Sequence, residues 1–314
     1  MAGTFKTTDT NTINEQWHKV MSTVAREETP VQTLCPSDSV GATTAFWFTD
    51  SLADANANNA QVEGAAAPEA NLVAPEKLSN HTQIFSKTAE VSRTLRSSIT
   101  LGTNDEFSRQ FDKISKEVKR DVEAALIGGQ GSVEHTGTVA GRLAGIEATI
   151  KENAFHGTGG STPGYTSPVY GAVVNADEAD LREFTEDMFN DAQHKAWSKG
   201  GRPDTVLVNG RLKRRISSFK GNSTMYQDAT KKKIFNVVDT YVGDFGTYSV
   251  IPHYLMSTTT VLGIDPSKFV VSYLDKWTKY DHGKSGDSDK KTLIAELTLK
   301  ALDERSHFKI ADVK

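Results

Sequence analysis

One long amphipathic stripe between residues 104 and 127 constrains this sequence most. Its apolar residues recur every three or four positions, the spacing of one helix face, and they are Phe107, Phe111, Ile114, Val118, Val122 and Leu126. Thr103, three residues before Glu106, predicts a capping box at the start, and Gly128 with Gly129 predicts the end. A helix of about six turns with a single apolar face has to pack along an equally long partner.

Two strand candidates precede this helix, at residues 43–49 and 82–92, and about 30 residues connect them. The part from 51 to 71 is rich in Ala and Asn, and its only large apolar side chains are Leu52 and Val62. Gly64 and the two prolines that follow it disfavour a continuous helix. Connections of this length are usually functional or disordered, so we expect this one to add nothing to the core.

After the long helix, the chain alternates between glycine-rich loops and short regular elements. A second amphipathic helix is predicted over 177–198, and a short basic one over 211–219. The last third reads mostly as strands, and residues 292–302 alternate most clearly between apolar and polar positions. Because helices and antiparallel strands are segregated, the sequence predicts an α+β fold.

Charge and composition exclude several classes of protein. The 314 residues carry a formal net charge of -4, which argues against broad electrostatic binding of nucleic acid. Two local basic clusters, Arg211–Arg215 and Lys231–Lys233, lack interleaved aromatics, which favours a solvated or subunit-contact surface over a phosphate site. Cys35 is the single cysteine, so neither an internal disulfide nor a multi-cysteine metal site is expected.

The sequence also predicts no membrane span and no exported precursor. No apolar run approaches the roughly 18 residues of a transmembrane helix. The first 20 residues have no apolar signal-peptide core, so we expect synthesis in a cytoplasm without export.

The sequence contains no complete chemical motif that would predict an enzyme or a cofactor-binding protein. Gly283-Lys284-Ser285 resembles the end of a phosphate-binding loop, but position 278, where that loop needs a glycine, is Thr. The eight histidines are scattered, and Asp287 and Asp289 lack the rest of a calcium loop. We therefore expect no catalytic residue, no cofactor and no metal, and a binding or structural role.

Five stretches, taken in order, resemble a known family. They are FWFTDSLADANANNAQVEGA, LSNHTQIFSKTAEVS, DEFSRQFDKISKEVKRDVEAALIGG, RPDTVLVNGRLKRRISSF and VVDTYVGDFGTYSVIPHYLM. They are similar to the major capsid proteins of tailed bacteriophages, which have the Hong Kong ninety-seven type of fold. The resemblance implies a structural protein that self-assembles into the icosahedral shell enclosing a phage genome. A nanocompartment shell of a cell, of the encapsulin type, is the alternative.

The resemblance also implies a map of the chain. An N-terminal arm would occupy residues 1–40 and a two-stranded extended loop residues 41–99. A peripheral domain, with the long helix as its spine, would combine 100–149 with 291–314. The axial domain would occupy 150–290. We expect the spine helix to bury Phe107, Phe111, Ile114, Val118 and Val122, with Phe111 and Ile114 near Leu297 and Leu299 of a returning strand.

Contacts between subunits follow from the same resemblance. An isolated two-stranded ribbon is only marginally stable in water, so the extended loop is expected to rest on a neighbouring subunit. The residues expected at this contact are Phe46, Trp47, Phe48, Asn58, Val62, Glu63, Ile84 and Phe85. The type member of the fold joins its subunits through a lysine in this loop. Residues 51–71 contain no lysine, so no covalent cross-link is expected here.

The implied partners are those of a virion component. The chain is expected to form pentamers and hexamers in a closed shell, together with a portal protein. Because only about 40 residues precede the extended loop, a separate scaffolding protein is expected. Double-stranded DNA would lie inside the shell without sequence-specific binding, and no membrane is involved. The resemblance leaves open whether a decoration protein binds.

Overall fold

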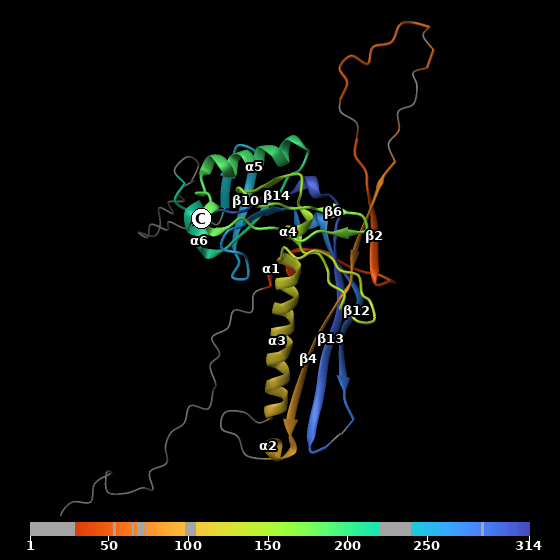
Figure 1. Ribbon diagram of the computed structural model, residues 1–314, viewed down its shortest axis with the longest axis vertical. Coiled ribbons are helices and arrows are strands. Elements are labelled where there is room, and N and C mark those ends of the chain that lie inside the picture. Colours follow the sequence, from red (N-terminus) through yellow and green to blue (C-terminus); the bar gives the residue numbers. More distant parts are fainter. Residues whose placement is uncertain are drawn as a thin grey trace, which may run out of the picture.

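The computed structural model describes residues 29–52, 55–64, 66–67, 72, 74–97, 105–219, 240–283 and 286–314. Thr103 of the expected capping box, Lys231–Lys233 and most of the N-terminal arm lie outside these residues. Figure 1 shows a long lower sheet with one helix along it, an upper body of sheet and helices, and a ribbon that extends away from both.

The lower part is a four-stranded sheet with two long strands at its centre. In spatial order the strands are β1 (Ser37–Ser39), β12 (Phe269–Asp281), β13 (Ser288–Ala301) and β4 (Gln83–Ser92). The pairs β12–β13 and β13–β4 are antiparallel, and β1 is parallel to β12. Leu293, Ala295, Leu297, Leu299 and Ala301 are all buried, so β13 has the alternation that its sequence predicts.

The long helix α3 (Glu106–Ile127) lies along this sheet (Figure 1). Its first turn is capped by Asp105, whose side chain accepts a hydrogen bond from the Phe107 N–H at 3.1 Å. A carboxylate at this position satisfies a free backbone donor and complements the positive end of the helix dipole. The helix ends at Ile127, and the N–H of Gly128 still bonds to the carbonyl of Ala124.

The apolar face of α3 divides into two clusters along the sheet. Phe107 and Phe111 pack with Ala89, Val91 and Leu293. From two turns further on, Val118, Val122 and Leu126 are buried in the main core with Phe85, Leu297 and Leu299. Ile114 is partly buried and contacts both clusters. Phe111 therefore packs against β13 at Leu293, not near Leu297 and Leu299 as expected. The reason is the alignment of the helix along the strand, which places Leu297 and Leu299 beside the later turns of α3 at Val118 and Val122.

The upper body is built on a mixed six-stranded sheet. Its spatial order is β5 (Ala154–Phe155), β14 (Phe308–Ile310), β11 (Val261–Ile264), β8 (Thr205–Val208), β10 (Gly246–Pro252) and β9 (Thr240–Gly243). The helices α5 (Glu186–Ser198) and α6 (Gly210–Ile216) pack against it, and Thr185 caps α5. Aromatic rings fill the space between, with Phe189 in contact with Phe184, Tyr241, Tyr248 and Phe308.

The remaining elements are short. They are α1 (Pro30–Leu34), α2 (Arg93–Ser97), α4 (Ile146–Thr149), β6 (Tyr165–Thr166), β7 (Val169–Tyr170) and the 3₁₀ turns η2 (Glu178–Asp180), η3 (Pro266–Lys268) and η4 (Glu304–Ser306). The helix predicted from residue 177 therefore begins only at Glu186, and it is preceded by η2 and by a short segment in which Arg182 forms an isolated β-bridge with Val313.

The chain crosses between the two parts more often than the expected domain map allows. The strand β12 lies in the lower sheet, although residues 150–290 were assigned to the axial domain. The strand β14 lies in the upper sheet, although 291–314 was assigned to the peripheral domain. Gly263 of β11 makes this return possible, because a Cβ there would stand 2.1 Å from the Phe308 ring. A side chain at position 263 would exclude the closing strand from the sheet.

A buried carboxylate ties the N-terminal segment to the rest of the fold. Glu123 of α3 is fully buried and accepts hydrogen bonds from the backbone N–H of Val31 at 2.7 Å and of Gln32 at 3.2 Å. His253, just after β10, contacts the same carboxylate through Nε2 at 3.1 Å. One acidic side chain thus joins α1, the spine helix and the end of an upper strand.

Candidate functional site

The ribbon is an antiparallel pair formed by β2 (Thr44–Thr49) and β3 (Glu76–His81). The expected partner of residues 43–49 was 82–92, but that segment is β4 and pairs with β13 instead. The change occurs at Thr82, where the chain leaves the ribbon and enters the long sheet. The extended loop therefore runs from residue 44 to 81, and β4 belongs to the body.

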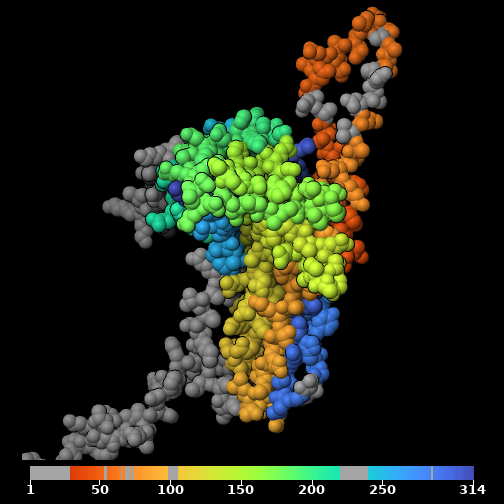
Figure 2. Space-filling model, in the orientation of Figure 1, coloured from red at the N-terminus to blue at the C-terminus, as the bar shows by residue number. Residues whose placement is uncertain are grey.

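The connection between β2 and β3 extends beyond the body of the molecule (Figure 2). Every residue of this connection whose burial the structure describes is exposed. Leu52 is 99% exposed, Leu72 91% and Val62 80%, so no described part of the chain covers these large apolar side chains. Asn58 and Glu63 are exposed beside them. The prediction that this connection adds nothing to the core agrees with these positions.

The two faces of β2 have opposite environments. Trp47 is 6% exposed, packs with Leu78, Ala144 and Tyr170, and donates a hydrogen bond from Nε1 to the carbonyl of Ala301 at 2.7 Å. Its neighbours Phe46 and Phe48 point the other way and are 53% and 69% exposed. The period of two along a strand produces this difference.

The structure thus divides the residues expected at the subunit contact. Trp47 and Phe85 are buried in the cores of their own chain, so their assignment to that contact is corrected. Phe46, Phe48 and Ile84 remain exposed, with Ile84 at 53%. The ammonium of Lys77 lies 4.1 Å from the centroid of the Phe46 ring, which leaves much of the aromatic surface open.

Asn80 anchors the base of the ribbon, a role that no sequence pattern predicts. Its side chain is fully buried, and Nδ2 donates to the carbonyls of Leu299 at 2.8 Å and Ala144 at 3.2 Å. Its Oδ1 accepts from the N–H of Ala144 at 2.9 Å. A lone Asn in a strand pattern carries no signal for this role, because its partners are more than 60 residues away in the sequence.

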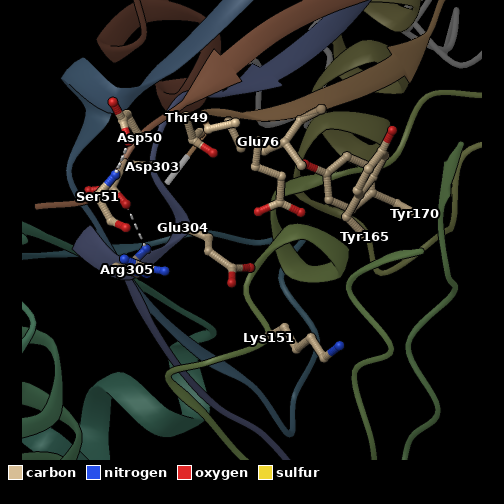
Figure 3. Close-up of a pocket in the computed structure, with 13 residues that line it drawn as sticks. Thr49, Asp50, Ser51, Glu76, Lys151, Tyr165, Tyr170, Asp303, Glu304 and Arg305 are labelled. Atoms are coloured by element: carbon tan, nitrogen blue, oxygen red, sulfur yellow. Dashed lines mark hydrogen bonds between the residues drawn. The ribbon is translucent and has the colours of Figure 1, made fainter. Parts of the chain in front are cut away.

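A hollow of about 370 Å³ lies at the base of the ribbon, between β2, β3 and the turn after β13 (Figure 3). Glu76 and Glu304 point into the same space from opposite sides. Burial raises the pKa of Glu304 above its usual range, and burial likewise raises the pKa of the Tyr170 hydroxyl. Neither a histidine nor a cysteine lines this hollow, so it offers no nucleophile with an adjacent imidazole base.

A buried polar network in the upper body has the order of groups found in a hydrolase. His156 contacts Thr162 Oγ1 through Nε2 at 2.8 Å and Asp312 Oδ2 through Nδ1 at 3.2 Å. Thr162 also accepts a hydrogen bond from Lys309, whose ammonium donates to the carbonyl of Glu147 at 3.0 Å. Thr162 is 8% exposed and Asp312 1%, so a substrate has no access to the hydroxyl.

The same network is well suited to holding the chain end in place. Asp312 accepts hydrogen bonds from the N–H groups of Gly157 at 3.0 Å and Ala176 at 2.9 Å. Burial lowers the pKa of His156, and it lowers that of Lys309 to about 8. These contacts connect the segment after β14 to the loops around β5, which is a structural role.

Among the residues that the structure describes, His, Cys, Asp and Glu side chains form no group of three or more that could hold a metal ion. No helix among the described residues is both long and apolar enough to span a bilayer.

Comparison with known proteins bears on the whole chain. A curated relative, the major capsid protein of Escherichia phage Phieco32, is 24% identical over 323 residues, which cover 89% of this chain and 88% of the relative. The capsid of an empty GTA particle superposes with a TM-score of 0.64 at 12% identity, over 98% of both chains. A procapsid of satellite phage P4 that includes the size determination protein superposes with a TM-score of 0.51 at 11% identity. The match covers 91% of this chain and 87% of the procapsid chain.

These structures are too distant in sequence to show more than the fold, and they agree with the α+β capsid fold expected from the five stretches. The family model of the SU10 major capsid protein matches residues 3–314, which is nearly the entire chain. Because both the curated relative and the family are phage capsid proteins, the comparisons favour a phage capsid over the alternative of a cellular nanocompartment. The chain therefore belongs to the SU10 major capsid protein family, whose members build the icosahedral capsids of tailed phages.

Proposed function

We propose that the β2–β3 ribbon and its connection bind neighbouring copies of this chain and so close the shell. One observation carries this proposal: the ribbon exposes large apolar side chains that no described residue of its own chain covers. Leu52, Val62 and Leu72 lie along the connection, and Phe46 and Phe48 lie on the outer face of β2. Exposed apolar surface of this kind typically marks an interaction site.

The proposed contact surface combines Phe46, Phe48 and Ile84 with Asn58, Val62 and Glu63 of the connection. Trp47 and Asn80 hold the inner face of the ribbon to the body, so the outer face is presented in a fixed orientation. A pre-ordered surface loses less entropy on association than a mobile one. Repeated between identical subunits, such a contact joins different patches on each copy and closes rings, which fits pentamers and hexamers.

Further partners are proposed on the same basis. A portal protein would occupy one vertex of the shell, and double-stranded DNA would fill it without sequence-specific contacts. A separate scaffolding protein would guide assembly in the host cytoplasm, and the P4 procapsid was solved with a size determination protein. The role proposed for the chain in the virion is structural and involves no enzymatic reaction.

The experiment compares Phe48→Ser with Val174→Ser, a change at a side chain that is 51% exposed and does not belong to the ribbon. Both variants should keep the circular dichroism spectrum and melting temperature of the unassembled wild-type subunit, because exposed positions contribute little to stability. Light scattering and electron microscopy should show closed particles for Val174→Ser and open or absent particles for Phe48→Ser. Normal particles from Phe48→Ser and from the double change with Phe46→Ser would reject the proposed surface.

A further inference from the structure

A second hollow lies at the free end of the upper body, where Figure 1 labels α6 and the C-terminus. Its volume is about 790 Å³. The charged side chains that line it are Glu183, Arg211, Arg214, Arg215 and Lys314. Among the described lining residues, four cationic side chains thus face one carboxylate side chain, in a chain whose formal net charge is -4. We call these residues the α6 cleft.

The basic residues of α6 lie in two different environments, one buried and one exposed. Leu212 and Ile216 are buried against the sheet, and Lys213 is drawn in with them. The Lys213 ammonium donates to the carbonyl of Val250 at 2.6 Å, so this cation is part of the packing. Arg211 and Arg214 are three residues apart, which places them on one face of the helix, and both are exposed.

Arg215 has an ion-pair partner, and the other two arginines have none among the described residues. Arg215 forms an ion pair with Glu183, and its Nε donates to the carbonyl of Phe184 at 3.0 Å. Glu183, the only carboxylate side chain among the described lining residues, is therefore in use. Neither Arg211 nor Arg214 has an ion-pair partner among the described residues, although acidic residues outnumber basic ones in the chain.

We propose that the α6 cleft binds phosphate groups of the nucleic acid that the capsid encloses. Guanidinium groups pair with phosphate through two parallel hydrogen bonds, and two guanidiniums on one helix face, without an ion-pair partner among the described residues, supply this chemistry twice. No aromatic side chain is among the described residues that line the cleft, a feature that in the sequence favoured a solvated or subunit-contact surface. The two guanidiniums that have no ion-pair partner among the described residues instead favour a contact with the phosphate backbone alone, without stacking on a base. The choice of nucleic acid over a free anion rests on the role of the chain in a capsid.

The test measures binding of a fluorescein-labelled DNA duplex of about 20 base pairs to the purified chain, by fluorescence anisotropy at several salt concentrations. The variant is Arg211→Gln with Arg214→Gln, which keeps good helix formers on α6. Each lost phosphate contact lowers the slope of log affinity against log salt by about 0.9, so the double variant should lose about 2 units and each single variant about 1. Two duplexes of unrelated sequence should behave alike, and inorganic phosphate should compete.

The matched control is Arg142→Gln with Arg202→Gln, which removes the same charge from two exposed arginines outside the cleft. This control should keep the wild-type slope. An equal loss in both double variants would show that only net charge matters, and an unchanged slope in the cleft variant would show that the cleft takes no phosphate. Either result overturns the proposal.

One further outcome identifies a different occupant. Loss of shell assembly by the cleft variant, with DNA binding unchanged, would assign the cleft to an acidic group of another subunit and also overturn the proposal. This result is independent of the ribbon, because the Phe48→Ser experiment measures assembly with the cleft intact. Circular dichroism of each variant verifies that α6 and the sheet beneath it remain folded, and the single variants provide the slope should the double variant not fold.

Discussion

At the scale of single residues, adjacent positions on β2 have unrelated roles. Replacing Trp47 with Ala removes its packing against Leu78 and Tyr170 and its hydrogen bond to Ala301, and should lower the free energy of unfolding by about 3–5 kcal/mol. Replacing Phe48 with Ala should change it by less than about 0.5 kcal/mol. Urea titration of unassembled subunits measures both values. Similar losses for the two variants would mean that the alternation of β2 is assigned wrongly.

His307 gives the molecule a specific sensitivity to acid. The ring is fully buried, stacks on Phe269 with centroids 4.3 Å apart, and accepts a hydrogen bond from the Asp265 N–H. Burial lowers its pKa to about 4. Between about pH 6.5 and pH 4 the unfolded chain binds a proton at this site and the folded chain does not, so stability falls as the pH falls, by at most about 3 kcal/mol.

The variant His307→Asn tests this pH dependence. Its amide oxygen can accept the same backbone hydrogen bond, and the side chain does not titrate. The free energy of unfolding, measured in urea at about pH 7 and about pH 5, should fall less in the variant than in the wild type. Carboxylates contribute equally to both proteins, so parallel losses would contradict the assignment.

At the scale of elements, the packing of α3 on the lower sheet can be measured through Phe111. Phe111→Ala should lower the free energy of unfolding by about 3–5 kcal/mol, because the ring is buried between Ala89, Val91 and Leu293. Lys113→Ala on the exposed face of the same helix is the control and should cost no more than about 0.5 kcal/mol. If Phe111→Ala had the same melting temperature as the control, the apolar face of α3 would not pack on the lower sheet at Phe111.

The ribbon is the second element that can be altered separately. Thr49 pairs with Glu76 at the last register of β2 and β3, so replacing residues 50–75 with an Asn-Gly turn should join the strands directly. We expect a folded subunit with an unchanged circular dichroism spectrum, because every described residue of the connection is exposed. Closed particles should be lost in microscopy. An unfolded subunit would mean that the connection stabilises its own chain.

At the scale of the whole molecule, the particle should be held together without covalent bonds between subunits. Residues 51–71 contain no lysine. Of the two lysines nearer the body, Lys77 lies over the Phe46 ring, and Lys87 pairs with Asp121 at 2.8 Å. Purified particles boiled in detergent should therefore give one band near 34.2 kDa. A ladder of larger bands would reveal a cross-link formed by another residue.

Local patterns were sufficient for much of this fold. The helix stripe, the alternation of β13 and the poverty of the 51–71 connection in large side chains are properties of neighbouring residues, and each corresponds to an observed feature. Strand partners were harder to predict, because β-branched and aromatic runs look alike whichever strand they pair with. The pairing of β2 with β3, and of β4 with β13, therefore differed from expectation.

The sequence by itself determined the class of the protein, the long helix with its apolar face, and a connection unable to form a core. The helix and the connection follow from periodicity and composition, which act over a few residues, and the class of the protein follows from the resemblance of five stretches to a known family. Only the tertiary structure decided that Trp47 is buried while Phe48 is free, that Asn80 and Glu123 hold distant segments together, and that β14 closes the upper sheet. The physical reason is that these outcomes depend on contacts between residues far apart in the chain, and the local sequence carries no record of which partner each residue meets.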